Sequence, residues 1–237
     1  MKGAAQRMTA SLEEITGGPL PFRLRPWDGS ESGPADPSGT LPVVVVRHRR
    51  ALRRLLWSPG ELGLAQAYDA VTAIETGEHV GDAAYPAFTR LIHDRLRPGG
   101  RALVQQMSRG AHAPGGGAFI ETHIAPDMHM RPLGETVGLL EGAGPEVRHT
   151  ESLREHYVRT VAAWAETLEA RWDEAVALVG EVTARVWRLC LAGGGLAFDQ
   201  RRMGVDQILA VRPGRDGSSG MPATPAAWYD GLGEAAR

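Results

Sequence analysis

One short strand, together with the residues that precede it, sets the main constraint on this fold. The run DAVTAIE (Asp69–Glu75) is mostly apolar, as expected of a buried parallel strand. The run directly before it, LGLAQAY (Leu62–Tyr68), is similar to the end of a separate N-terminal accessory module. Doubly wound α/β sheets usually begin with a strand, a glycine-rich turn and a helix, and no such unit separates these two runs. We therefore expect an α/β sheet without its usual first half.

The residues after this strand continue as an α/β fold. Ala83–Leu96 has the apolar stripe of an amphipathic helix. The turn RPGG (Arg97–Gly100) ends it, and Arg101–Ser108 is predicted to be the next strand, which completes a βαβ unit. Phe119–Pro132 is irregular and is interpreted as a lid. The later predicted elements are a helix at Leu133–Gly144, a strand at Pro145–Ser152, a long helical stretch at Tyr157–Leu191 and a final strand at Val205–Pro213.

The chain divides into three predicted regions. Residues 1–68 form a small α+β module, in which Phe22–Trp27 and Leu41–Arg49 are expected to be strands and Ala51–Ser58 a helix. Residues 69–213 form the main domain. Residues 214–237 are rich in Gly, Pro and Ser, and we expect them to be disordered.

Composition excludes several classes of protein. Of the 237 residues, 43% are hydrophobic and 23% charged, which is ordinary for a globular protein. The net charge of −2 gives no argument for nucleic acid. The single cysteine, Cys190, excludes an internal disulfide and fits a reducing compartment. Without a long apolar run or a signal-peptide pattern, the chain is expected to be cytoplasmic.

Four motifs in order resemble one family of enzymes. They are YDAVTAIETGEHVG, LRPGGRALVQQMS, HYVRTVAAW and the segment TARVWRLCLAGGGLAFDQRR with DQILAVRP after it. Together they are similar to the cyclopropane-fatty-acyl-phospholipid synthases, which are S-adenosylmethionine (SAM)-dependent C-methyltransferases and include the mycolic acid cyclopropane synthases. The resemblance implies a truncated class I (Rossmann-like) methyltransferase sheet with a helical lid. It also implies that the four strands from Asp69 onward lie in the order 4-5-7-6 of that family.

The resemblance breaks at the cofactor site. About 100 residues, one half of such a fold, are missing between Tyr68 and Asp69. None of the glycine clusters follows an apolar strand with G-x-G-x-G spacing. SAM is expected from the family, although its binding motif is absent. The loss leaves Asp69–Glu75 as an apolar edge strand, which the N-terminal module, a second copy or another protein must cover.

The resemblance assigns three residues to the catalytic site. Glu78, in the turn E-H-V-G, matches the glutamate that holds a bicarbonate ion, and that ion takes a proton from a cationic acyl intermediate. Tyr157 matches a tyrosine whose hydroxyl reaches the same ion. Gln105 stands where cyclopropane synthases often have a histidine, so simple methylation stays open beside ring closure. A carboxylate beside an anion must hold or share a proton, so we expect Glu78 to be buried with a raised pKa.

Other residues favour structural roles. His79, His123, His129 and His156 do not match a zinc-binding spacing, although His79 could tune Glu78. Trp164, Trp172 and Trp187 have the spacing of core residues, and Cys190 is interpreted as a buried helix residue. A basic run could contact anionic phospholipids or form a solvated helix face; its residues are Arg47, Arg49, Arg50, Arg53 and Arg54.

Three functions remain open from the sequence. The first is C-methylation or cyclopropanation of an unsaturated acyl chain, with the missing half supplied by a partner chain or by another pocket. The second is a non-catalytic module that binds lipid or regulates a partner. The third, with less support, is a cofactor-independent isomerase or cyclase that uses Glu78 and Tyr157 as acid and base.

Overall fold

The computed structural model describes the backbone of residues 43–46 and the whole of residues 68–228. The predicted strand Phe22–Trp27, the predicted helix Ala51–Ser58 and the basic run Arg47–Arg54 lie outside these ranges. Among the described residues, no helix is both long and apolar enough to cross a bilayer.

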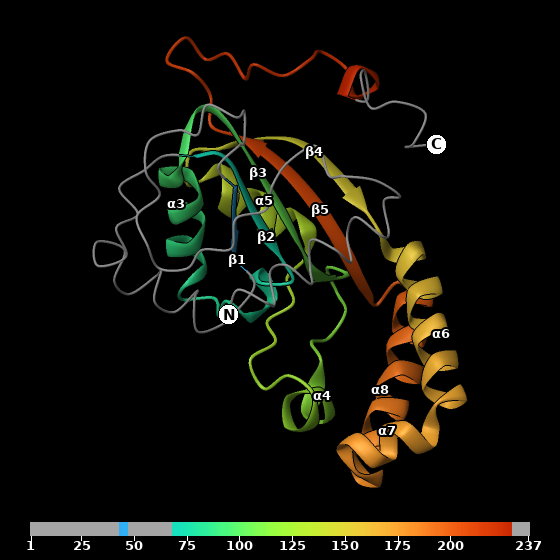
Figure 1. Ribbon diagram of the computed structural model, residues 1–237. Coiled ribbons are helices and arrows are strands. Elements are labelled where there is room, and N and C mark those ends of the chain that lie inside the picture. Colours follow the sequence, from blue (N-terminus) through green and yellow to red (C-terminus); the bar gives the residue numbers. More distant parts are fainter. Residues whose placement is uncertain (1–42, 47–67, 229–237) are drawn as a thin grey trace.

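The described strands form one mixed sheet (Figure 1). They are β1 (Val43–Val46), β2 (Tyr68–Ile74), β3 (Leu96–Arg109), β4 (Glu146–Ser152) and β5 (Met203–Val211). Their order across the sheet is β1-β2-β3-β5-β4. β1, β2 and β3 run parallel, whereas β5 is antiparallel to both β3 and β4. The predicted order of the four strands after Tyr68 is therefore confirmed.

The edge of β2 that was expected to need a cover is paired within the chain. β1 lies parallel to β2, with Val43 opposite Ala70 and Val46 opposite Ala73. Of the three covers considered, this one comes from a strand of the predicted N-terminal module, which pairs with β2 from Ala70 to Ala73. β1 stands beside β2 where the first strand of a doubly wound sheet would be expected.

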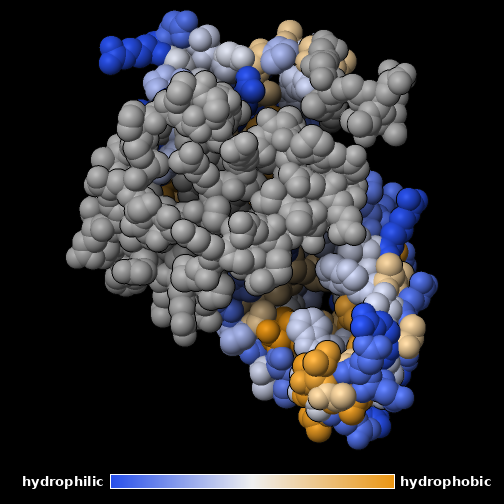
Figure 2. All heavy atoms as spheres, viewed as in Figure 1, coloured by the Kyte–Doolittle hydropathy of each residue, from blue (hydrophilic) through white to orange (hydrophobic). Residues whose placement is uncertain are grey.

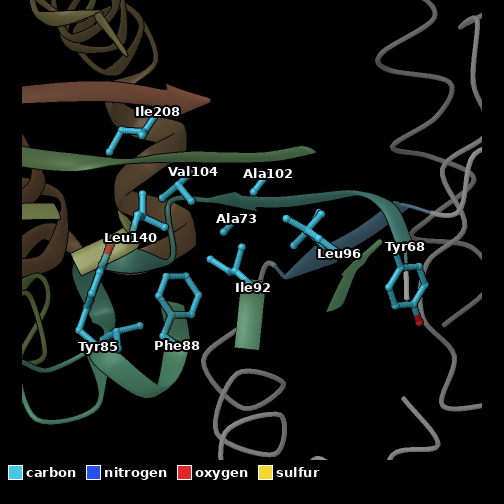
Figure 3. Packing of buried hydrophobic residues seen from close by; sticks show 12 residues of the cluster. Tyr68, Ala73, Tyr85, Phe88, Ile92, Leu96, Ala102, Val104, Leu140 and Ile208 are labelled. Carbon is cyan, nitrogen blue, oxygen red and sulfur yellow. The ribbon is translucent and has the colours of Figure 1, made fainter. Parts of the chain in front are cut away.

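Two helices cover one face of the sheet. α3 (Tyr85–Arg95) begins with Pro86 in its first turn and ends before the PGG turn of β3. α5 (Leu133–Glu141) contacts α3, β4 and β5. Figure 3 shows how Phe88 and Ile92 of α3 pack against the strands, and this cluster forms the main core. The members of this core in Figure 3 are Tyr68, Ala73, Tyr85, Phe88, Ile92, Leu96, Ala102, Val104, Leu140 and Ile208.

The long helical stretch is confirmed and forms three helices. α6 (Arg154–Ala170), α7 (Trp172–Val179) and α8 (Glu181–Asp199) project together beyond one end of the sheet (Figure 1). Gly180 separates α7 from α8 with a φ of 83°, in the left-handed region that glycine adopts most easily. α8 leads into β5, and the first residue of β5, Met203, lies opposite Arg109, the last residue of β3. These helices therefore adjoin the end of the sheet at which β3 ends.

The tryptophans of these helices are not the core residues that the sequence predicted. Trp164 and Trp187 are 54% and 45% exposed. Trp172 is half-buried and lies under the guanidinium of Arg188, 4.0 Å from its ring centre. Figure 2 shows hydrophobic side chains gathered at the far tip of this helical projection. Exposed apolar residues of α7 and α8 are Leu178, Val179, Val182, Leu189 and Leu196.

Two further segments contain short helices. The lid segment contains a short helix, α4 (Gly117–His123). After β5 the chain continues to a short 3-10 helix, η2 (Pro225–Trp228), within the range predicted to be disordered. Arg101 donates to the carbonyl of Gly220, and the ring of Trp228 packs edge-on against His149.

Candidate functional site

The fold brings the three predicted site residues to one end of the sheet. Glu78 lies in a 3-10 turn, η1 (Gly77–His79), soon after β2 ends. Gln105 lies on β3 opposite Ile74, the last residue of β2. Tyr157 lies in the first turn of α6, which begins after β4 at the same edge. Parallel strands end at a common edge, so side chains that are distant in the sequence meet there.

Glu78 is a buried carboxyl with an unusual pKa. It is 1% exposed, and its Oε2 has no hydrogen-bond partner among the described residues. Burial, followed by the negative charge of Glu75, raises its pKa to about 8. Hydrogen bonds from the backbone N–H groups of Glu78 and Met107 oppose this rise. The expectation of a buried Glu78 with a raised pKa is confirmed.

Tyr157 and Gln105 contact each other and a second carboxylate. The Tyr157 hydroxyl donates to Glu75 Oε1 over 3.2 Å, and Gln105 Nε2 donates to the same oxygen over 3.1 Å. Gln105 Nε2 also lies 3.4 Å from the Tyr157 hydroxyl. Burial, and then the charge of Glu75, raises the pKa of Tyr157 to about 12, so its hydroxyl remains a donor. Glu75 thus joins the predicted residues into one group.

Two members of this group were missed from the sequence. Glu75 is the first residue after β2, and the spacing E-x-x-E with Glu78 was a readable sign of two carboxylates at a strand end. Gln207 Nε2, on β5, donates to Gln105 Oε1 over 2.7 Å. No local pattern marks Gln207, because its place depends on the antiparallel register of β3 and β5.

A separate polar network holds the η1 turn from the other side. Gly77 lies against Gln106, and a Cβ on Gly77 would be 1.8 Å from Gln106 Oε1. The Tyr85 hydroxyl donates to that same oxygen over 2.5 Å, and Gln106 Nε2 donates to Thr136 over 3.3 Å. Arg131, which is 3% exposed, lies 4.1 Å from the centre of the Tyr85 ring. These contacts fix the turn that carries Glu78.

Arg131 also binds the segment after Glu78. Its Nη2 donates to the carbonyl of Val80 over 2.8 Å and to Asp82 over 2.6 Å. The backbone N–H of His129 donates to the Glu78 carbonyl over 2.6 Å. The last part of the predicted lid, which contains His129 and Arg131, therefore contacts the turn that carries Glu78 and the residues directly after it.

Two of the remaining candidates, His79 and Cys190, have other surroundings. His79 pairs with Asp127, with 3.4 Å between Nδ1 and Oδ1. Cys190 is half-buried on α8, where burial raises its pKa. Across the described ranges, no three His, Cys, Asp or Glu side chains come together as a metal site.

The described residues contain no glycine-rich turn, directly after a parallel strand, that could bind SAM. Gly77 packs on Gln106 and leaves no space at the end of β2. Gly193–Gly195 lies inside α8, and Gly115–Gly117 lies in the loop between β3 and α4 and at the first residue of α4, not directly after a strand. A SAM site would need residues outside the described ranges or from a second chain.

A family model matches this chain over most of its length. The model for mycolic acid cyclopropane synthetase covers residues 52–208. This chain belongs to that family. The matched range contains the Glu75–Glu78 turn, Gln105 and Tyr157.

Relatives in the family are longer than this chain. A probable fatty acid methyltransferase of Mycobacterium tuberculosis is 32% identical over 164 residues, which cover 68% of this chain and 38% of that protein. A probable fatty acid methyltransferase of Pseudomonas putida is 34% identical, with 68% and 42% covered. The chain therefore spans about two fifths of the length of these relatives.

Solved structures of the family share the fold. The cyclopropane synthase MmaA2 from Mycobacterium tuberculosis has a TM-score of 0.57 at 23% identity, with 61% of this chain and 55% of that chain covered. The mycolic acid cyclopropane synthase CmaA1, complexed with SAH and CTAB, has the same TM-score at 24% identity, and the covered shares are again 61% and 55%. The class I methyltransferase sheet expected from the sequence is confirmed.

Proposed function

We propose that this chain forms the acyl-acceptor side of a SAM-dependent lipid C-methyltransferase. The observation that carries the proposal is the group of Glu75, Glu78, Gln105 and Tyr157, which places two carboxyls and two donors at one strand end. Membership of the cyclopropane synthetase family supports the reaction class. The names of the relatives, fatty acid methyltransferases, support an acyl chain as the substrate.

Each residue has a distinct part in this proposal. Glu78, with a pKa of about 8, holds a proton at neutral pH, so the pair with Glu75 carries one negative charge. Tyr157 and Gln105 orient the charged carboxylate through their hydrogen bonds. One negative charge beside the acyl chain stabilises a carbocation formed on that chain. SAM supplies the methyl group when it is bound, by residues other than those described.

The test is transfer of label to a lipid. The whole chain is incubated with SAM carrying a ¹³C-labelled methyl group and vesicles of dioleoyl phosphatidylglycerol, and the acyl chains are analysed by mass spectrometry. We expect labelled acyl chains with the unaltered chain. Glu75→Gln removes the negative charge of the pair and should lower the rate by about 100-fold or more, in the range for a lost electrostatic contact with the transition state.

The matched control is Glu141→Gln. Glu141 is an exposed glutamate at the end of α5, away from the site, and its replacement should leave the rate unchanged. Absence of label in the unaltered chain would contradict the proposed methyl transfer. Equal rates for the Glu75→Gln and unaltered chains would contradict the part given to Glu75.

A second candidate function is lipid binding without catalysis. Two observations favour it: the described residues offer no SAM cradle, and Leu178 and Val182 at the tip of the helical projection are 82% and 79% exposed. Exposed apolar side chains in such a group are typical of a contact with lipid or protein. Native mass spectrometry that finds bound oleoyl lipid, together with no label transfer and no heat of SAM binding, would select this candidate.

A further inference from the structure

The two donors that the family resemblance assigns to an external anion are already used by this chain. Tyr157 and Gln105 both donate to Glu75 Oε1, over 3.2 and 3.1 Å. A bicarbonate ion held by the same hydroxyl and the same amide would have to displace the Glu75 carboxylate. The residues present therefore do not fit bicarbonate beside Glu78.

Gln105 cannot easily turn its amide group to serve another ligand. Its Oε1 accepts a hydrogen bond of 2.7 Å from Gln207 Nε2. A side-chain amide has one oxygen and one nitrogen, so this bond leaves Nε2 directed at Glu75 and Tyr157. Gln207 on β5 thereby fixes the donor that Glu75 uses.

The backbone of Glu75 is also held in a special conformation. Its φ is 50°, in the left-handed region that residues other than glycine seldom adopt. Its N–H donates to the carbonyl of Gln105 over 2.9 Å. Such conformations persist where the surrounding contacts require them, and they gather at functional sites. Backbone and side chain of Glu75 are thus both tied to Gln105.

We infer that the carboxylate of Glu75 takes the place of an external bicarbonate ion and is the proton acceptor of this site. The role of Glu75 as proton acceptor rests on the proposed function. The claim that its carboxylate occupies the anion position does not depend on that function. Glu75 is exposed on one side, whereas Glu78 is buried. The acceptor therefore has a route to solvent that its buried partner does not have.

The proton transfer balances without any further reactant. A methyl group added to an alkene leaves a carbocation on the neighbouring carbon. The electron pair of one C–H bond then forms a new C–C or C=C bond, and the proton passes to Glu75. Loss of that proton from the added methyl group gives a cyclopropane, and loss from a chain carbon gives an alkene. Glu75 afterwards releases the proton to solvent.

The test measures binding of ¹³C-labelled bicarbonate to the whole chain by NMR line broadening. The unaltered chain and the control Glu141→Ala should show no saturable binding. Glu75→Ala empties the position beside both donors and should gain saturable binding, which the double variant Glu75→Ala/Tyr157→Phe should lose. This readout needs no SAM and no turnover, so failure of the proposed methyl transfer would leave it intact.

Two results would overturn the inference. One is saturable bicarbonate binding by the unaltered chain that Tyr157→Phe abolishes. The other is a folded Glu75→Ala chain that gains no binding. Should Glu75→Ala not fold, Glu75→Gln keeps the side-chain shape and loses the charge. The pKa of Tyr157 should then fall, and an unchanged value would show that Glu75 does not occupy the donors.

Discussion

Two neighbouring glutamines on β3 show how this sheet separates structure from chemistry. Gln106 is buried on the side of α3 and α5, where Tyr85 and Thr136 satisfy its amide. Gln105 is half-buried on the opposite side, where it contacts Glu75 and Tyr157. Gln106 packs against the η1 turn, and Gln105 contacts the residues of the candidate site. Alternation along a strand is sufficient to give adjacent, identical side chains these two roles.

The packed side should show the largest effect on stability. Arg131→Ala removes a guanidinium that donates to the Val80 carbonyl and to Asp82, and that lies on the Tyr85 ring. We expect a loss of about 3 kcal/mol in the free energy of unfolding, because hydrogen bonds to a charged group contribute about 1.5–3 kcal/mol each. Urea denaturation measures the change.

Arg148→Ala is the matched control. Arg148 pairs with Glu146 on the partly exposed strand β4, and its removal should cost less than about 1 kcal/mol. Similar losses for Arg131→Ala and Arg148→Ala would mean that the contacts of Arg131 do not hold the turn.

Substitution of the two glutamines tests the difference between the two sides of β3 most directly. Gln106→Leu leaves the hydroxyls of Tyr85 and Thr136 without their buried partner, which should cost about 2 kcal/mol. Gln105→Leu should cost less than about 1 kcal/mol, because its partners Glu75 and Tyr157 reach solvent, but it should impair label transfer. Thermal unfolding and the lipid assay on both variants check this. Equal loss of stability in the two variants would contradict the separation.

Gly77 tests how closely the turn approaches the packed side. Gly77→Ala places a Cβ 1.8 Å from Gln106 Oε1, so the turn or Gln106 must move. Overpacking of this kind costs about 1–3 kcal/mol. Gly138→Ala, in α5 with open space around it, should instead stabilise the chain by about 0.5–1 kcal/mol. Denaturation midpoints that move in the same direction for both variants would contradict this reading of Gly77.

Much of this arrangement follows from the sequence. The parts that could not be predicted from the sequence have one physical reason in common. Glu78, Gln105 and Tyr157 lie in motifs with local spacing, and the order of β2, β3, β5 and β4 follows from the family pattern. The pairing of β1 with β2 is a contact between distant segments, and no local pattern specifies it. Gln207 was missed for the same reason, since its partner depends on strand register. Exposure of Trp164 and Trp187 depends on where the helices stand relative to the sheet.

The titration of Glu78 also links the site to stability. The pKa of Glu78 is raised in the folded chain, so the folded state keeps the proton that the unfolded state loses above pH 4.5. Stability from Glu78 is therefore full below about pH 4.5, falls as the pH rises, and stops falling above about pH 8. Glu78→Gln should remove this dependence and make the chain more stable than the unaltered one at pH 9. Urea denaturation at pH 4.5 and pH 9 measures both changes.

The proton that Glu78 holds beside the negative charge of Glu75 is the central claim, and a ¹³C NMR titration of the glutamate side-chain carboxyls tests it most directly. Assigned by comparison with Glu78→Gln, the Glu78 signal should titrate with an apparent pKa near 8 in the unaltered chain. In Glu75→Gln the neighbouring negative charge is gone, so the apparent pKa should fall while burial keeps it above the ordinary value. A Glu78 signal that titrates near pH 4.5 in the unaltered chain, or that is unchanged by Glu75→Gln, would contradict the account.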